Sequence, residues 1–248
     1  IRELRREGVD VKRPSVNKSK AEFAATGEGE VRFGLSTIKY VGKEAQVFLE
    51  ERETGGPFES FMECLCRCTP NARAVKALIK AGAFDDFDLS RAAMMEAHDK
   101  VLTYARKRRN YKQGSRKSMP DAPQVHDVAE FPRQSRFQQE REVASTYTGG
   151  PPTDDFRWLA RHLSGHEHAH KGTRYRLELA TVMKVKEQTT SNGNRMWWVT
   201  YQTAGYEIPD SAAMWDSTYE EIGDHLRPDT AVMLVLETDV RGEYAGSY

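Results

Sequence analysis

The chain has 248 residues, of which 38% are hydrophobic and 30% charged, enough for one large domain or two small ones. No run of about 18 apolar residues and no signal peptide occurs, so the sequence excludes a membrane-spanning helix, and we expect no membrane partner. The 37 basic and 37 acidic side chains cancel, which would disfavour a nucleic-acid partner only if they were evenly distributed.

The first half of the chain is predicted to be helical. Residues 1–7 begin with Ile and have the pattern of a helix interior, so we expect the chain to be a fragment of a longer protein. A strand-like alternation covers 30–35, and the spacing of apolar residues predicts helices at 45–53, 60–67, 72–81 and 90–109. Gly82 stands where a C-terminal glycine cap belongs, and Ser90 is suited to be the N-cap of the longest helix.

The second half of the chain changes its period. From 110 to about 136 the composition turns to Pro, Ser, Gln and charge, which is typical of a linker. After a short helix predicted at 154–163, residues 175–185 alternate as in a strand, and Asn192-Gly193 is a strong hairpin signal. Further strands are predicted at 196–201 and 231–237. The sequence therefore predicts an α+β fold with a helical half and a small β half.

Basic side chains are concentrated in two stretches. No carboxylate lies between Lys100 and Lys117, and the stretch up to Lys20 is also rich in Lys and Arg. A local positive field suffices to bind phosphates whatever the net charge, although a solvated helix end is the simpler interpretation of charge alone. Within the first stretch we take as candidate DNA contacts Arg106, Arg108 and Arg109.

The three cysteines lie within five residues, at Cys64, Cys66 and Cys68. Neighbours this close do not build a disulfide framework, which fits a reducing cytoplasm. Zinc sites favour a wider spacing, so we predict buried thiols that pack the helical half.

Two glycine corners between helices carry the functional prediction. Residues 38–43 precede one helix and residues 78–84 close another. A glycine at such a turn lets backbone N–H groups point outward, where they bind a phosphate oxygen, and two lysine-flanked corners in tandem are stronger evidence than one. The predicted contacts at the two corners are Lys39, Val41, Gly42, Lys43, Lys80, Ala81 and Gly82.

Several segments, taken in order, resemble the bacterial and phage DNA polymerase III α subunit family. They are Pro14-Ser-Val-Asn17, Phe23, the run from Val31 to Gly42, the run from Gly56 to Phe61, the run from Leu78 to Asp85 with Arg91, Glu140-Arg-Glu142, the run from Tyr147 to Pro152, and the run from Thr190 to Arg195. The resemblance covers nearly the whole chain. It implies a fingers-like end at 1–35, a tandem helix-hairpin-helix module at 36–110, a basic linker at 111–153 and an OB-like antiparallel β barrel at 154–248.

The same resemblance implies a function. The helix-hairpin-helix module would grip primer-template duplex and the OB-like domain would hold single-stranded template, as the C-terminal part of a replicative polymerase and together with the rest of that polymerase or replisome. Such contacts go to phosphates and base faces, so binding should be nearly independent of sequence and sensitive to salt.

Two departures from the family pattern bear on the sites. The family has glycine where this chain has Tyr40, whose side chain would crowd a phosphate, so we favour the second corner over the first. The family's clamp-binding peptide should lie near Gln113, where the aromatic anchor is missing, which makes sliding-clamp binding doubtful. The altered sequence suggests a phage relative or a divergent lineage.

No catalytic residue is assigned to this chain. The family holds its catalytic Mg²⁺ through an Asp-x-Asp pair in a palm far upstream, and polymerisation needs such metal-binding carboxylates. The spacing of Asp86 and Asp88 matches, but it follows the second corner and reads as a polar turn. We therefore expect no cofactor in this chain, and Mg²⁺ only in the palm of a parent polymerase.

The β half offers aromatic and basic residues for a single strand. OB-folds stack bases on aromatics while cations follow the backbone. Trp197 and Trp198 must point to opposite faces of a strand, so one is expected in the core, and the other either stacks a base or covers an end of the barrel. The candidate contacts are Lys184, Lys186, Arg195, Trp197, Trp198 and Tyr201, with Tyr206 as a further aromatic.

Two other functions compete with this interpretation. His166-Glu167-x-x-His170 matches a zinc-protease motif, but its polar, glycine-flanked context predicts a loop, and a weak adventitious metal site joined by His162 is the better alternative. A free-standing replisome adaptor without polymerase activity would also bind DNA. The gene upstream of Ile1 would distinguish an adaptor from a polymerase fragment.

Overall fold

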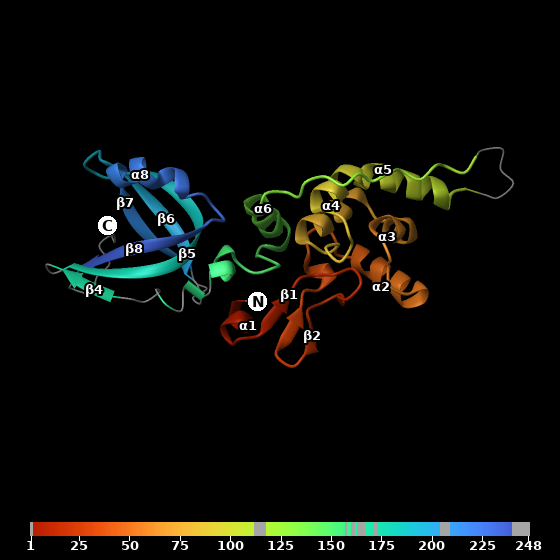
Figure 1. Cartoon of the computed structure of the whole chain (residues 1–248), viewed down its shortest axis with the longest axis horizontal. Coiled ribbons are helices and arrows are strands. Elements are labelled where there is room, and N and C mark those ends of the chain that lie inside the picture. Colours follow the sequence, from red (N-terminus) through yellow and green to blue (C-terminus); the bar gives the residue numbers. More distant parts are fainter. Residues whose placement is uncertain are drawn as a thin grey trace. The chain divides into compact units, whose positions relative to one another are not determined.

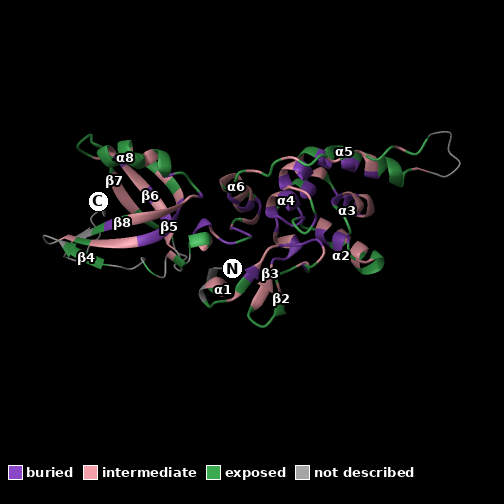
Figure 2. Cartoon of the chain, in the orientation of Figure 1, coloured by how far each residue is buried: buried purple, intermediate pink, exposed green. Residues whose placement is uncertain are grey.

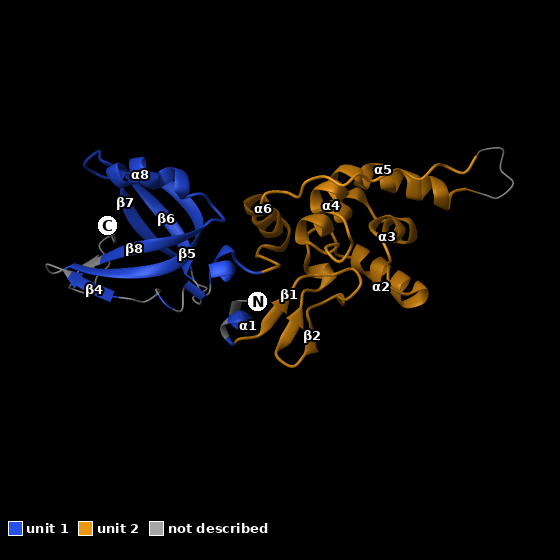
Figure 3. Cartoon of the chain, in the orientation of Figure 1, with its two compact units in different colours: residues 1–7, 150–248 blue, residues 8–149 orange. Residues whose placement is uncertain are grey.

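The computed structural model describes residues 2–111, 118–156, 158–159, 162, 167–170, 173–203 and 209–239. The chain divides into two compact units (Figures 1 and 3). Unit 1 comprises 1–7 and 150–248, and unit 2 comprises 8–149. The helices lie mainly in unit 2 and the larger sheet in unit 1, so the predicted α+β class, a helical region and a sheet-rich region, is confirmed.

Unit 2 begins with a small sheet. Its strands are β1 (Asp10–Lys12), β2 (Ala24–Gly27) and β3 (Glu30–Arg32), in the order β1-β3-β2. The strand predicted at 30–35 therefore ends at Arg32, and a 3-10 turn, η1 (Leu35–Thr37), leads into the first corner. The short helix α1 (Arg2–Arg6) precedes the sheet and belongs to unit 1.

Five helices follow in the described part of unit 2, and side-chain caps set the N-terminal ends of three of them. Ser60, Asn71 and Ser90 each accept a hydrogen bond from the backbone N–H three residues later, as N-caps do. The helices predicted in the first half are confirmed, with the cap at Ser90 among them. The five are α2 (Glu44–Gly55), α3 (Phe61–Cys68), α4 (Ala72–Ala81), α5 (Arg91–Arg109) and α6 (Arg133–Ala144).

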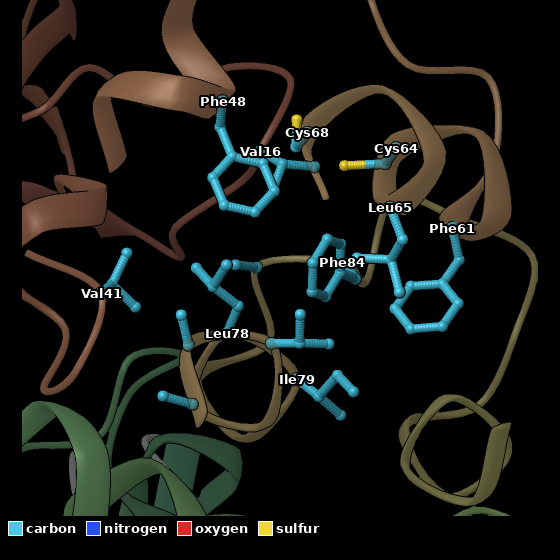
Figure 4. Close-up of a cluster of buried hydrophobic side chains, with 14 of the residues drawn as sticks. Val16, Val41, Phe48, Phe61, Cys64, Leu65, Cys68, Leu78, Ile79 and Phe84 are labelled. Carbon is cyan, nitrogen blue, oxygen red and sulfur yellow. The ribbon is translucent and has the colours of Figure 1, made fainter. Parts of the chain in front are cut away.

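An apolar core joins α2 to α5 (Figures 2 and 4). Phe84 is fully buried and meets Phe61 edge-on, with ring centroids 5.1 Å apart. Cys64 and Cys68 are buried in the same cluster, which confirms the prediction of packing thiols for these two, whereas Cys66 is only half-buried. Burial raises the pKa of the Cys64 thiol. The core thus fixes the helices that carry both glycine corners.

Unit 1 is built around one long strand, β5 (Thr173–Thr189). It pairs with β6 (Arg195–Thr203) along its second half and with β8 (Ala231–Asp239) along its first half, and the register shifts between Val182 and Lys184. β6 pairs onward with β7 (Asp210–Trp215), and β4 (Glu167–His170) pairs with the start of β5. Two short helical segments, α8 (Asp216–Ile222) and η3 (Gly223–His225), connect β7 to β8. Among the described residues no ladder closes this sheet into a barrel.

Four elements differ from the sequence predictions. Helix α6 starts inside the predicted linker, because its few buried side chains, Phe137, Glu140 and Val143, are too sparse to give a clear apolar stripe. Strand β4 replaces the predicted polar loop around His168, because pairing with β5 satisfies its backbone. β7 and α8 were not predicted. The helix predicted at 154–163 falls partly outside the described residues; within them, η2 covers Pro152–Phe156.

None of the helices in the described ranges is long and apolar enough to cross a lipid bilayer.

The core makes a prediction for stability. Replacing Phe84 with Ala should destabilise unit 2 by about 3–5 kcal/mol, because a fully buried ring leaves a cavity. All four tryptophans lie in unit 1, so denaturant unfolding followed by helix circular dichroism and by tryptophan fluorescence separates the units. In Phe84→Ala the denaturant midpoint should fall in the circular dichroism of the helices and stay unchanged in the tryptophan fluorescence. Phe23→Ala, at a ring that is 37% exposed, is the control and should shift it far less.

Candidate nucleic-acid interface

The second glycine corner is closed by its own hydrogen bonds. Gly82 ends α4 in the left-handed conformation, with φ 77°. Its N–H donates to the Ile79 carbonyl at 3.0 Å, and the Ala83 N–H donates to the Leu78 carbonyl at 2.9 Å. This pattern caps a helix C-terminus and uses both amides internally.

The guanidinium of Arg91 covers this corner. Arg91 is 1% exposed and donates through Nε and Nη2 to the two oxygens of Asp85, at 2.8 and 2.6 Å. Nη1 and Nη2 both donate to Glu140 Oε1 at 3.1 Å, and Nη1 also donates to the Lys80 carbonyl at 3.2 Å. These contacts match the five N–H donors of an arginine. Burial alone would lower the pKa of Arg91. The hydrogen bonds and charges of Asp85 and Glu140 outweigh burial and raise this pKa, so the side chain remains charged.

Glu140 extends this network to the end of unit 2. Its side chain is 1% exposed, and Oε2 accepts from the Thr148 and Gly149 N–H groups at 3.0 and 3.3 Å. The Thr148 hydroxyl donates to the Ala81 carbonyl, and Arg13 contacts Asp85 at 3.2 Å. Segments that are far apart in sequence therefore meet at the C-terminus of α4, where the buried cation Arg91 pairs with the buried Glu140 and the part-exposed Asp85.

The preference for the second corner is therefore corrected. Gly82 and Ala81 are buried, and a Cβ added at Gly82 would lie 2.2 Å from Arg91 Nη2. Lys80 is held by both oxygens of Glu142 at 2.7 Å. At this corner Gly82 therefore faces Arg91, and its backbone N–H is not available to a phosphate.

The first corner is open. Gly42 has φ 33°, and Gly42 and Lys43 are exposed at the start of α2. Within the described ranges neither of their backbone N–H groups donates a hydrogen bond, and no side chain caps the helix. Val41 differs, because its side chain is 1% exposed and its N–H donates to the Ile38 carbonyl. The open donors are thus those of Gly42 and Lys43.

Contrary to the prediction, the Tyr40 side chain does not block this corner. Its backbone is left-handed, with φ 68°, a conformation that costs a residue with a side chain about 1 kcal/mol. The 51% exposed ring lies against the guanidinium of Arg73 on α4, with Arg73 Cζ 3.8 Å from the ring centroid. The side chain is therefore held on α4, and the left-handed backbone explains why glycine suits this position.

Cations surround the first corner. On α4, Arg73, Lys76 and Lys80 share a face because they are three, four and seven residues apart. Lys39 Nζ donates to the Glu142 carbonyl at 2.8 Å. No carboxylate pairs with Lys43 or Lys76 in the part of the chain that the structure describes.

The predicted basic end of α5 lies at another place in unit 2. Arg106, Arg108 and Arg109 occupy its last turn and are exposed. Arg109 donates to the Thr69 hydroxyl. Burial raises the pKa of Cys66, although the neighbouring Arg108 opposes the shift. Part of this basic end is thus engaged with α3.

In unit 1 the candidate aromatics separate by burial. Tyr201 is 1% exposed and belongs to the core, so, contrary to the prediction, its ring is not available to stack on a base. Trp197 stacks on Tyr219 of α8 with centroids 3.6 Å apart, and its Nε1 donates to Asp216 Oδ1 at 2.9 Å. Trp198 is half-buried and has Lys186 and Ala213 as cross-strand neighbours, while Lys184 is exposed nearby on β5.

The described residues contain no group of side chains suited to hold a metal. Asp85 is bound by Arg91, and Asp86 accepts from Ser15 and pairs with Lys18 at 3.0 Å. The residues present therefore do not fit a catalytic magnesium site. His170 lies in strand β4, whereas His166, Gln113 and Tyr206 lie outside the described residues.

Comparisons with known proteins agree with the sequence resemblance. A family model described as a helix-hairpin-helix motif matches residues 8–94, which include both glycine corners. DNA polymerase III subunit alpha of Thermus aquaticus is 28% identical over 98% of this chain, and that of Treponema pallidum is 26% identical over 97%. The chain is a relative of the DNA polymerase III alpha subunits. The alignments cover only 21% and 22% of these two proteins, so the chain spans about a fifth of their length.

The closed corner at Gly82 predicts that alanine substitution destabilises the protein more at Gly82 than at Gly8. Gly82 and Gly8 have nearly the same φ, 77° and 79°, but a Cβ at Gly8 would meet nothing within 4 Å. Gly8→Ala should cost about 1 kcal/mol of unfolding free energy from backbone strain alone. Gly82→Ala should cost clearly more, because Arg91 must also move. Equal losses in urea unfolding would show that Arg91 does not close the corner.

Proposed function

We propose that this chain is a non-catalytic, DNA-binding portion of a replicative DNA polymerase III alpha subunit, and that unit 2 holds primer-template duplex at its first glycine corner. The observation that carries this proposal is at the exposed residues Gly42 and Lys43, whose backbone N–H groups donate no hydrogen bond to any residue that the structure describes and lie among cations. Backbone donors at the start of a helix bind phosphate oxygens well, because the helix dipole adds to the hydrogen bonds.

The basic face of α4 would extend the phosphate contacts from this corner. Arg73 and Lys76 lie on the same exposed face, and the Tyr40 ring supports the Arg73 guanidinium. The cations at this surface outnumber the carboxylates Glu44 and Glu142. Contacts of this kind read no bases, so they would suit a polymerase that copies any sequence.

For unit 1 we propose an OB-like single-strand-binding domain. The path β5-β6-β7, then a helix, then β8 returning to pair with β5, matches the first four strands of that fold. The register shift in β5 would let this strand serve both sides of a barrel, since bulges bend strands. Outward-facing Trp198, Lys184 and Lys186 would contribute stacking and charge to a strand bound there.

Polymerisation itself would come from another part of a longer chain. The carboxylates and Mg²⁺ that it needs are assigned to a palm outside this sequence. We keep the division into a fingers-like end at 1–35, a hairpin module at 36–110, a linker at 111–153 and an OB-like domain at 154–248 as part of this proposal. The proposed setting is the cytoplasm.

Charge reversal at the first corner tests the duplex contact. Lys43→Glu should weaken binding of a primed duplex about tenfold at low salt, because it removes a phosphate partner and adds repulsion. The slope of log affinity against log salt should also fall by about one. Fluorescence anisotropy with a labelled primed duplex measures both values.

Lys100→Glu is the matched control. This exposed lysine lies in the middle of α5, outside the proposed surface, and makes the same change in net charge. Its duplex affinity should stay close to that of the unmodified chain. An equal loss in the two variants would mean that only overall charge matters, and the first corner would no longer be the site.

A further inference from the structure

Unit 1 has an open hollow of about 510 Å³ beside the β5–β6 turn. One wall is the turn itself, and the other is the junction between β7 and α8. The residues around it are Gly193, Asn194, Arg195, Trp215, Asp216 and Ser217.

Trp215 is the aromatic with a free surface here. It is 61% exposed, whereas Trp197 is stacked on Tyr219 and Tyr201 is in the core. An exposed tryptophan beside a hollow offers a planar, apolar surface of the size of a nucleobase.

The charges around the hollow favour a neutral ligand over a phosphate. Arg195 lies 3.2 Å from Asp216 Oδ1 and 3.3 Å from Glu187 Oε1, so two carboxylates compensate its charge. Asp216 Oδ1 also accepts from Trp197 Nε1. The other oxygen, Oδ2, accepts no hydrogen bond from the described residues, which leaves an oriented acceptor next to Trp215.

We propose that Trp215 and Asp216 bind one unpaired nucleobase of a single strand. The base would stack on the indole of Trp215, and its exocyclic amino group would donate to Asp216 Oδ2. Cytosine, adenine and guanine carry such a group and thymine does not, so the site should discriminate against thymine. This inference rests on the proposed single-strand function of unit 1 and adds the residues and the base chemistry to it.

Two pyrimidine oligonucleotides of equal length test the proposal. Fluorescein-labelled dC12 and dT12 are titrated with the full 248-residue chain, and anisotropy gives the dissociation constants. The unmodified chain should bind dC12 more tightly than dT12. Trp215→Ala should weaken dC12 binding by about 5- to 150-fold, the effect of losing one stacked base, while Trp215→Phe should retain most of it. Asp216→Asn should remove the preference for dC12 over dT12, because Oδ1 is held by Trp197 Nε1 and the new NH2 group is a donor where Oδ2 was an acceptor.

Trp158→Ala is the control, because Trp158 is 63% exposed in the same unit and does not line the hollow. Unchanged binding in Trp215→Ala, an equal loss in Trp158→Ala, or equal affinity of the unmodified chain for dC12 and dT12 would overturn the inference. These outcomes are distinct from failure of the proposed function, in which the unmodified chain binds neither oligonucleotide nor duplex.

Discussion

The buried guanidinium of Arg91 is the interaction on which the arrangement of unit 2 depends. It connects the turn after α4, through Asp85, to α6, through Glu140, and Glu140 in turn holds the backbone at Thr148 and Gly149. Removing one member of such a buried charge network leaves the others uncompensated in a medium of low polarity, which is costly. The network therefore specifies how four separate segments meet.

This constraint also decides which glycine corner is available. The two corners look alike in sequence, but Arg91 fills the space beside Gly82, whereas Gly42 is exposed and its amide donates no hydrogen bond within the described part of the chain. Tyr40, which the sequence suggested as an obstacle, is held against Arg73. The first corner, at Gly42, was expected to be blocked and is open. The second corner, at Gly82, was expected to be open and is closed by Arg91.

The sequence predicted what depends on neighbouring residues. The N-cap at Ser90, the C-terminal cap at Gly82 and the turn at Gly193 are local signals, and the structure confirms them. The Arg91–Glu140 pair joins residues 49 positions apart, and nothing near Arg91 in sequence distinguishes it from an exposed cation. Helix α6 and strand β7 were missed for a related reason: their polar or small residues are ordered by the partners that they pack on.

If the first corner holds the duplex, Gly42 and Lys43, and not Gly82 and Ala83, donate their backbone N–H groups to the DNA backbone. Amide chemical shifts measured by nuclear magnetic resonance, on the full chain titrated with a primed duplex, test it most directly. Large shifts are expected for Gly42 and Lys43, and small shifts for Gly82 and Ala83, whose N–H groups donate to carbonyls of α4. Large shifts at Gly82 and Ala83, with Gly42 and Lys43 unchanged, would contradict it.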